Sequence, residues 1–316
     1  MPAHPGFFPN FFIVGAPRCG TTSLSKYLKD NPQVRFSFPK ETHFFTSIYP
    51  NHPDVDIERD YVERFFRRPK RQQRSVGEGS VTYLYSPEAI AAIKELKPDA
   101  RFIVMARNPM EMLPSYHGLL LFMLAEDAED FAVAWALQET RALGRNIPRH
   151  CNDPRTLQYR EVGQIGAYTE RLIEIAGAEN TLVLLYDDLI HDTLGVYKRA
   201  LEFLGADYDG RTEFPRYWQG RVYRSRFLQE ALYRTPRKVG GTREFLEKRA
   251  REGKSRRKGR GKSASKRLYQ RAVTMNTRSA SRPPLDPETR QLLRESFAPD
   301  IERLGRIVGR DLSHWT

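Results

Sequence analysis

The residue types and spacing of a phosphate-binding loop occur near the N-terminus. The loop reads Gly15-Ala16-Pro17-Arg18-Cys19-Gly20-Thr21-Thr22-Ser23. It follows an apolar run that ends at Gly15, and its last residues open an expected helix. Backbone N–H groups at such a helix start face an anion, and the helix dipole adds about half a positive charge. We call Gly15–Ser23 the phosphate loop and expect it to hold a phosphate group.

The phosphate loop lacks the lysine that nucleoside triphosphatases carry. Gly15 and Gly20 have the separation found in G-x-x-x-x-G-K-[ST], but Thr21 stands where that motif has lysine. The cation lies earlier in the loop, at Arg18, and a guanidinium keeps its proton at ordinary pH. The loop therefore favours a phosphate-bearing donor other than a nucleoside triphosphate.

A second candidate phosphate site follows the apolar run Arg101–Ala106. Arg107 stands at an expected strand-to-helix turn, and Ser115 lies about two helical turns further on. A guanidinium and a hydroxyl so placed can converge on one phosphate, and each charge-assisted contact contributes about 1.5–3 kcal/mol. The alternative is an arginine paired with a carboxylate at a helix start, with a serine that has no role. Because Arg18 and Arg107 both follow strand ends, the phosphate site is favoured.

The segment between these two sites contains residues suited to acid–base chemistry. It reads Phe38-Pro39-Lys40-Glu41-Thr42-His43-Phe44-Phe45. Glu41 can accept the proton of an acceptor hydroxyl, and a positioned base contributes about 10²–10⁴-fold in rate. His43 orients Glu41, binds the acceptor or is itself the base. Lys40 and Arg18 are candidate cations for a charged transferred group. The alternative is a surface loop anchored by its phenylalanines.

The elements that must position these residues alternate between strands and helices. We expect strands at residues 11–15, 75–79, 101–106 and 181–186, and helices at residues 21–29, 87–96, 109–124, 131–143, 166–175, 193–204 and 287–297, the last with a continuation after Pro299. Apolar strands that alternate with helices predict an α/β fold with a parallel sheet covered on both faces. Such folds bind ligands beyond the carboxyl ends of the strands, where Arg18 and Arg107 lie.

The charge of the chain is concentrated in one segment. The 316 residues suit a single domain, residues 1–316, with a net charge of +13. Residues 234–271 hold 16 Lys and Arg against three acidic residues, which accounts for the whole net charge. We expect a flexible insertion here. It is a solvated insertion without a specific role, a contact for an acidic glycan, or a nucleic-acid contact, although no nucleic-acid module accompanies it.

The remaining composition indicates a soluble protein. We find no apolar run of about 18 residues and no signal peptide, and we expect a cytoplasmic, bacterial protein. The two cysteines, Cys19 and Cys151, do not indicate a disulfide framework. Metal chemistry is not expected, because we find no His/Cys cluster with ligand spacing.

The motifs together resemble those of sulfotransferases that use 3′-phosphoadenosine 5′-phosphosulfate (PAPS). The phosphate loop resembles their 5′-phosphosulfate loop. Arg107 and Ser115 resemble their 3′-phosphate motif, R-[ND]-P-x-x-x-x-x-S, and residues 41–45 resemble an E-x-H-F-F element. The chain is most similar to bacterial relatives of the carbohydrate and heparan sulfate (3-O- and N-) sulfotransferases. This resemblance implies a P-loop-NTPase-like sheet, PAPS as co-substrate, adenosine 3′,5′-bisphosphate as product, and transfer to a hydroxyl or amine, on a saccharide.

The resemblance also implies roles for individual residues. Glu41 is implied as the base, His43 as its support, and Lys40 and Arg18 as cations at the reaction centre. The residues implied to bind the donor are Arg18, Cys19, Gly20, Thr21, Thr22, Ser23, Arg107 and Ser115, with Arg278 or Arg282 in a basic loop that closes over the donor.

The chain departs from the family pattern at three places. Thr46 stands where an acidic residue is common, and Arg18 stands where lysine is more usual. Gly79 replaces the lysine of a later E-K-[ST]-P-x-Y element. These departures leave the identity of the acceptor open.

Two other functions remain as alternatives. The Gly15–Gly20 spacing is also typical of a P-loop kinase or other nucleoside triphosphatase, in which Asp187-Asp188 could hold Mg²⁺. A polyanion-binding protein would act through the basic segment, and its binding would weaken steeply with salt.

Overall fold

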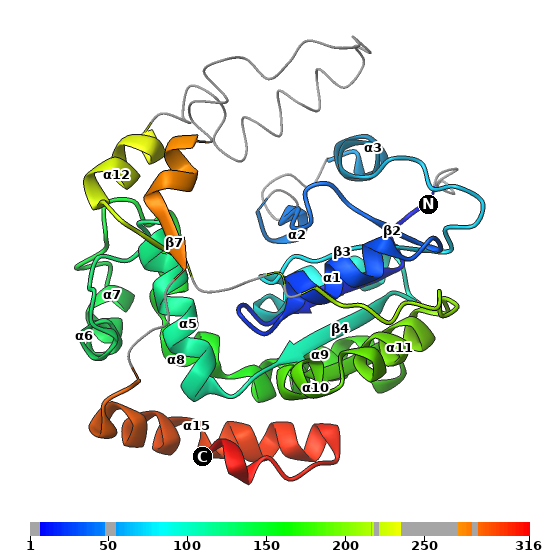
Figure 1. Ribbon diagram of the computed structural model, residues 1–316. Helices are drawn as coiled ribbons and strands as arrows, with labels where there is room; N and C mark the ends of the chain where they lie inside the picture. The colour runs from blue at the N-terminus through cyan, green and yellow to red at the C-terminus, as the bar shows by residue number, and fades with distance from the viewer. Residues whose placement is uncertain (1–6, 48–54, 216, 218–220, 235–270, 280–283) are drawn as a thin grey trace. The chain divides into compact units, whose positions relative to one another are not determined.

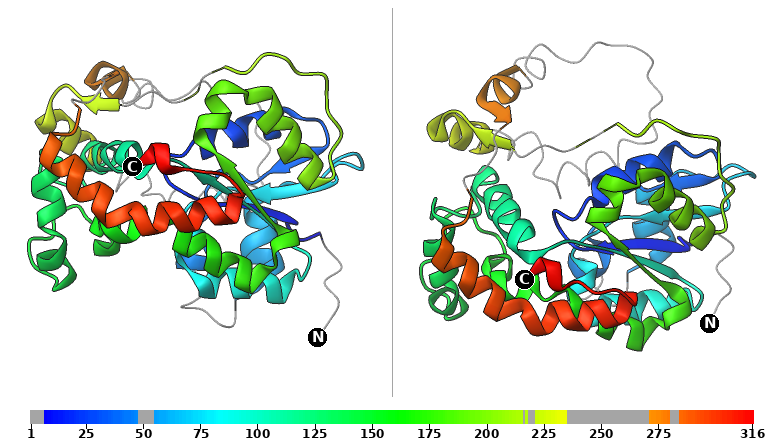
Figure 2. Two further views of the ribbon diagram at one scale, coloured as in Figure 1. Left: turned by 90° about the horizontal axis from the view of Figure 1, so that it is seen from below. Right: turned by 60° about the horizontal axis from the view of Figure 1, so that its bottom comes forward.

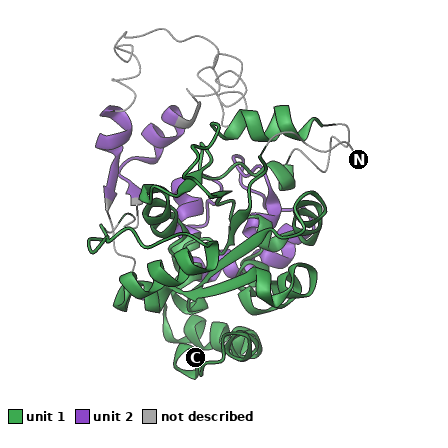
Figure 3. Ribbon diagram, turned by 90° about the vertical axis from the view of Figure 1, so that its right-hand side faces the viewer, with its two compact units in different colours: residues 1–116, 158–218, 285–316 green, residues 117–157, 219–284 purple. Residues whose placement is uncertain are grey.

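The computed structural model describes residues 7–47, 55–215, 217, 221–234, 271–279 and 284–316 (Figure 1). The chain forms two compact units, which Figure 3 colours separately. Unit 1 comprises Met1–Tyr116, Gln158–Trp218 and Leu285–Thr316, and unit 2 comprises His117–Leu157 and Gln219–Pro284. The phosphate loop, the 38–45 segment, Arg107 and Ser115 all belong to unit 1.

Unit 1 is built on a five-stranded parallel sheet. Its strands are β1 (Phe11–Gly15), β2 (Val34–Phe36), β3 (Ser75–Glu78), β4 (Arg101–Ala106) and β5 (Thr181–Leu185). Every residue of β1 is buried, as are the last five residues of β4, which explains their unbroken apolar sequences. The expected α/β fold with a parallel sheet is confirmed.

The strand order, β2-β3-β1-β4-β5, sets where a ligand can bind. After β1 the chain forms β2 and β3 on one side of that strand and then returns to form β4 and β5 on the other side. The strand order therefore reverses between β1 and β4. Ligands of α/β folds bind at such a point, beyond the carboxyl ends of the strands. Because Gly15 is in register with Val104, the segments that follow β1 and β4 leave the sheet beside each other.

Helices cover both faces of the sheet in unit 1 (Figure 2). The helix α1 (Thr21–Asp30) packs with α11 (Thr193–Leu204) on one face, and α4 (Pro87–Leu96) packs with α9 (Ile165–Ala176) on the other. The C-terminal α15 (Pro287–Val308) lies against α9. The shorter helices of this unit are α2 (Phe44–Ser47), α3 (Glu63–Phe65), α8 (Tyr159–Gly163) and α10 (Tyr186–His191).

Local signals explain where several helices begin. The Ser86 side chain accepts a hydrogen bond from the Ala89 N–H, with Pro87 in the first turn of α4. Asp286 caps α15 in the same way by accepting from the Thr289 N–H at 2.8 Å. Among the described residues, none of the helices combines the length and apolar character that crossing a membrane requires.

The structure differs from the expected elements at several places, and the short helices α2, α3, α8 and α10 were not among those expected. The short β2 was not expected, because three residues carry no readable period. A π-helical turn, Ile57–Val62, also lies where no element was expected. The single helix expected at 131–143 is two helices, α6 (Phe131–Ala136) and α7 (Gln138–Ala142).

Unit 2 begins within α5 (Pro109–Phe122), whose last six residues belong to it. It also holds α6, α7, α12 (Arg226–Arg234) and an antiparallel pair of strands, β6 (Arg221–Tyr223) and β7 (Thr277–Ser279). A fully buried ion pair joins Arg141 to Glu126, with each of the two terminal guanidinium nitrogens 2.6 Å from a carboxylate oxygen. The expected basic insertion, residues 234–271, lies outside the described residues except at its two ends.

Candidate functional site

The phosphate loop connects the carboxyl end of β1 to the first turn of α1. Gly20 is the N-cap of α1 and has φ +89°, a left-handed conformation that residues with a side chain rarely adopt. A Cβ at this position would lie 2.7 Å from a methyl group of Leu189 and 3.1 Å from the ring of Tyr186, so the available space also requires glycine. The turn leaves the first N–H groups of α1 at the carboxyl edge of the sheet, where an anion is favoured.

Arg107 lies next to Arg18, which is part of the phosphate loop. The Nε of Arg18 donates to the Ser115 Oγ at 2.9 Å, and the Nη1 of Arg107 donates to the backbone oxygen of Arg18 at 3.4 Å. Burial first, and the positive charge of Arg107 second, lower the pKa of Arg18, which still stays protonated at neutral pH. An anion bound beside the two guanidinium groups would relieve their repulsion, so the local electrostatics favour a phosphate.

The contacts of Arg107 differ in part from the expectation. The Ser115 hydroxyl, expected to converge with Arg107 on one phosphate, bonds to Arg18 instead. Arg107 donates to Glu111 Oε2 from Nη2 at 2.7 Å and from Nε at 3.1 Å, which is the carboxylate pairing weighed as the alternative. Its guanidinium also lies 4.2 Å from the centre of the Tyr186 ring. Because the Glu111 side chain is 57% exposed, solvent weakens this ion pair and a phosphate can compete for the guanidinium.

The 38–45 segment follows β2 and brings three polar side chains together. The Lys40 Nζ lies 2.8 Å from Glu41 Oε1, and the His43 Nε2 lies 3.4 Å from Glu41 Oε2. Burial of Glu41 opposes its ionisation, but hydrogen bonds and charge from His43 and Lys40 together outweigh burial and lower its pKa to about 2. Glu41 is therefore a carboxylate at neutral pH, which is the form that can accept a proton. The His43 Nδ1 is held by the Thr82 hydroxyl at 3.0 Å, which fixes the ring.

The buried carboxylate of Glu78 holds this segment in place, a role that was not predicted from the sequence. Glu78, at the end of β3, is fully buried and accepts hydrogen bonds from the hydroxyls of Thr42 (2.8 Å), Tyr61 (2.6 Å) and Tyr83 (2.9 Å). The Ser80 hydroxyl accepts from the Thr42 N–H at 3.0 Å. A glutamate at the end of an expected strand, followed shortly by Ser80 and Tyr83, is the signal that could have identified this network. Phe44 and Phe45 are both buried and anchor the segment in the core.

The other expected donor-binding residues lie in different surroundings. The Thr21 hydroxyl accepts from the Lys40 Nζ at 3.2 Å, and the side chains of Thr22 and Ser23 are partly exposed in the first turn of α1. Arg278 is exposed on β7, in unit 2. Arg282 lies outside the described residues.

Cys19 cannot present its thiol to a ligand in this structure. Its side chain is fully buried, and burial raises the pKa of the thiol to about 12. A raised thiol pKa leaves the neutral, unreactive form in place until the pH approaches that value. The role expected for Cys19 in donor binding therefore falls to its backbone N–H alone.

Thiol labelling checks this difference between the two cysteines. At about pH 8, 5,5′-dithiobis(2-nitrobenzoate) is expected to react slowly with half-buried Cys151 in the native protein and to reach Cys19 only after denaturation. A Cys151→Ala variant should then consume no reagent until denaturant is added. Fast labelling of Cys19 in that native variant would contradict the buried placement.

The two carboxylates that could hold Mg²⁺ in a kinase are engaged by the C-terminal residues of the chain. Asp187 accepts a hydrogen bond from the Trp315 Nε1 at 2.8 Å. Asp188 accepts from the Arg310 Nη1 at 2.6 and 2.8 Å. In the part of the chain that the structure describes, no three His, Cys, Asp or Glu side chains are grouped closely enough to hold a metal ion.

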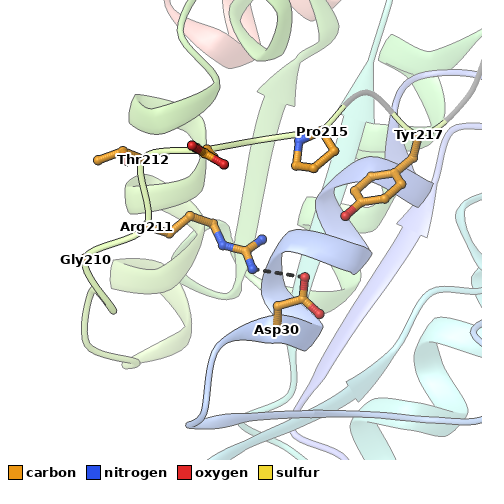
Figure 4. Close-up of a pocket in the computed structure, with 7 residues that line it drawn as sticks. Asp30, Gly210, Arg211, Thr212, Pro215 and Tyr217 are labelled. Atoms are coloured by element: carbon orange, nitrogen blue, oxygen red, sulfur yellow. Dashed lines mark hydrogen bonds and ion pairs between the residues drawn. The ribbon is translucent and has the colours of Figure 1, made fainter.

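A surface hollow of about 470 Å³ lies at the other end of α1 from the phosphate loop (Figure 4). Arg211 and Asp30 form an ion pair across its wall, with 3.0 Å between Nη2 and Oδ2. Asp30 is the last residue of α1, so the length of that helix, about 15 Å, separates the hollow from the loop. The hollow is therefore separate from the phosphate loop, whose expected donor-binding residues lie at the carboxyl edge of the sheet.

Comparisons with known proteins show what the chain is similar to. The sulfotransferase domain family matches residues 8–223, a range that contains the phosphate loop, the 38–45 segment, Arg107 and Ser115. A solved structure, a sulfotransferase from Alicyclobacillus acidocaldarius, is similar with a TM-score of 0.64 and 25% identity, covering 98% of this chain and 99% of that one.

Two curated relatives are similar over part of their length. Carbohydrate sulfotransferase 15 of Mus musculus is 26% identical over 246 residues, covering 62% of this chain and 43% of that protein. Heparan sulfate glucosamine 3-O-sulfotransferase 6 of Homo sapiens is 26% identical over 202 residues, covering 63% of this chain and 52% of that protein. The chain thus spans about half the length of these curated relatives.

Proposed function

Because this chain belongs to the sulfotransferase domain family, we propose that it transfers the sulfuryl group of PAPS to a hydroxyl or amine of an acceptor. The observation that carries this proposal is the adjacency of Arg18 and Arg107 beside a helix N-terminus. A nucleotide with phosphates at both ends matches that concentration of positive charge. The donor is a substrate, and the chain supplies its binding site and the proton acceptor.

We assign the two phosphate-bearing ends of the donor to different elements. The N–H groups of the phosphate loop, with Arg18, Thr21, Thr22 and Ser23, would hold the 5′-phosphosulfate. Arg107 would hold the 3′-phosphate, exchanging its exposed pair with Glu111 for that anion. The Ser115 hydroxyl accepts from Arg18 and would orient that guanidinium between the two ends.

The transfer step needs a base and charge stabilisation. The acceptor oxygen or nitrogen forms a bond to sulfur while the bond from sulfur to the 5′-phosphate oxygen breaks, and that oxygen keeps the electron pair. Glu41 takes the acceptor proton, because it is ionised at neutral pH and open to solvent on one side. Arg18 and Lys40 stabilise the negative charge that develops on the phosphate oxygen. His43 orients Glu41 through the 3.4 Å contact.

The acceptor is proposed to be a saccharide. The support is that the two relatives are a carbohydrate sulfotransferase and a heparan sulfate glucosamine 3-O-sulfotransferase. An exposed site agrees with a large acceptor, since the side chains of Glu41 and His43 are 35% and 38% exposed.

Nucleotide binding tests the proposed function. By isothermal calorimetry without added metal, the protein is expected to bind adenosine 3′,5′-bisphosphate at least about tenfold more tightly than ADP, since ADP lacks the 3′-phosphate. Incubation with radiolabelled PAPS and a panel of saccharides then identifies the acceptor. Preference for ADP or ATP in the presence of Mg²⁺ would instead support the kinase alternative.

A further inference from the structure

The ammonium group of Lys40 contacts both halves of the proposed site. Its Nζ donates to the Thr21 hydroxyl of the phosphate loop at 3.2 Å and to Glu41 Oε1 at 2.8 Å. Thr21 belongs to the first turn of α1, and Glu41 belongs to the segment after β2. One cation thus joins the anion-binding helix start to the proposed base.

Gly79 leaves the space in which the Lys40 side chain lies. A Cβ at position 79 would be 2.7 Å from the Lys40 Cε and 3.4 Å from its Cγ. The nearest other atom would be the Ser25 Oγ at 3.3 Å. The Gly79 N–H also donates to the Lys40 backbone oxygen at 2.9 Å, so the two residues are fixed side by side. Position 79 therefore controls how the Lys40 side chain reaches the phosphate loop.

Resting on the proposed function, we propose that Gly79 is the positioning residue that lets the Lys40 ammonium bind the 5′-phosphate end of the donor while it holds Glu41. The ammonium lies within hydrogen-bond distance of the first turn of α1, where an anion is favoured. Its side chain is 21% exposed, less than those of Glu41 and His43, so solvent screens a charge-assisted contact of this ammonium only in part.

The contact with the 5′-phosphate is tested by comparing two nucleotides. Calorimetry on the full chain measures the affinity for adenosine 3′,5′-bisphosphate and for adenosine 3′-monophosphate, which lacks the 5′-phosphate. Lys40→Ala is expected to weaken the binding of the bisphosphate about tenfold and to change the affinity for the monophosphate by less than about twofold. Lys26→Ala is the matched control, because that α1 lysine lies over the Tyr217 ring, 3.7 Å from its centre. It should change neither affinity.

The role of Gly79 is tested by a double-mutant cycle. Gly79→Ala is expected to weaken the binding of the bisphosphate about threefold to tenfold, because the added methyl group displaces the end of the flexible Lys40 side chain. In a Lys40→Ala background the same change should have no further effect, because there is no side chain left to displace. The double variant Lys40→Ala, Gly79→Lys should bind the bisphosphate at least about threefold more tightly than Lys40→Ala alone, since a side chain from position 79 points into the space that Lys40 vacates.

The outcomes separate this inference from the proposed function. If the wild-type protein binds neither nucleotide, the proposed function fails. The inference about Lys40 and Gly79 is overturned if Lys40→Ala weakens the binding of both nucleotides equally. It is also overturned if the losses of bisphosphate affinity in Gly79→Ala and Lys40→Ala simply add in the double variant. In both cases the proposed function stands as long as the wild-type protein binds the bisphosphate. Melting temperatures of all variants confirm that they are folded.

Discussion

Replacing Glu41 with glutamine is expected to lower the turnover number for sulfuryl transfer at least about a hundredfold, because a positioned general base contributes about 10²–10⁴-fold. Glutamine keeps the shape of the side chain but cannot accept the acceptor proton. The affinity for adenosine 3′,5′-bisphosphate should not fall, since the change removes a negative charge beside an anion site. The rate is measured as transfer of radiolabelled sulfate from PAPS to the acceptor or to water, and the affinity by calorimetry.

Two further variants make this result specific. Glu95→Gln, an exposed position in α4, is the matched control and should leave the rate unchanged. His43→Ala should lower the rate less than Glu41→Gln if His43 only orients Glu41. Near-normal turnover in Glu41→Gln, with a large loss in His43→Ala, would make His43 the base and refute the assignment of Glu41.

Replacing Arg107 with alanine is expected to weaken adenosine 3′,5′-bisphosphate binding by roughly tenfold to a hundredfold, the equivalent of one charge-assisted contact of about 1.5–3 kcal/mol. The fold should persist, because the guanidinium bonds to exposed Glu111 and stacks on Tyr186 rather than filling the core. Calorimetry measures the affinity, and binding of adenosine 5′-monophosphate should change little since that nucleotide lacks the 3′-phosphate.

Arg306→Ala is the matched control for Arg107→Ala. Arg306 also pairs with a glutamate four residues away, Glu302, at 2.8 Å, but it lies in the last turn of α15. Its removal takes away the same kind of helix ion pair and the same charge without touching the proposed site. If the two variants bind the bisphosphate equally well, Arg107 does not hold the 3′-phosphate.

The long apolar strands and the capped helices of unit 1 could be predicted from the sequence. Strands β1 and β4 are buried on both faces, so an unbroken apolar run identifies each of them. Capping residues such as Ser86 and Asp286 mark helix starts through local hydrogen bonds. The three-residue β2 and the π-helical turn Ile57–Val62 depend on contacts with the rest of the fold, and no local signal identified them.

The sequence by itself determined which residue types are available at the site. The phosphate loop and Arg107 are next to local signals, namely a glycine-bounded turn and a strand end, and Lys40 and Glu41 were identified by the residue types of their own segment. These signals can be read from the sequence because backbone conformation and helix starts depend on residues that are neighbours in the chain.

Only the tertiary structure decided which of these residues meet. Ser115 bonds to Arg18 rather than joining Arg107, Lys40 reaches Thr21 across the space left by Gly79, and buried Glu78 holds the segment that carries Glu41. Each contact joins residues at or after the ends of different strands, and the parallel sheet brings those carboxyl ends to one edge. Side-chain partners across a sheet depend on that order and register, which sequence spacing does not encode.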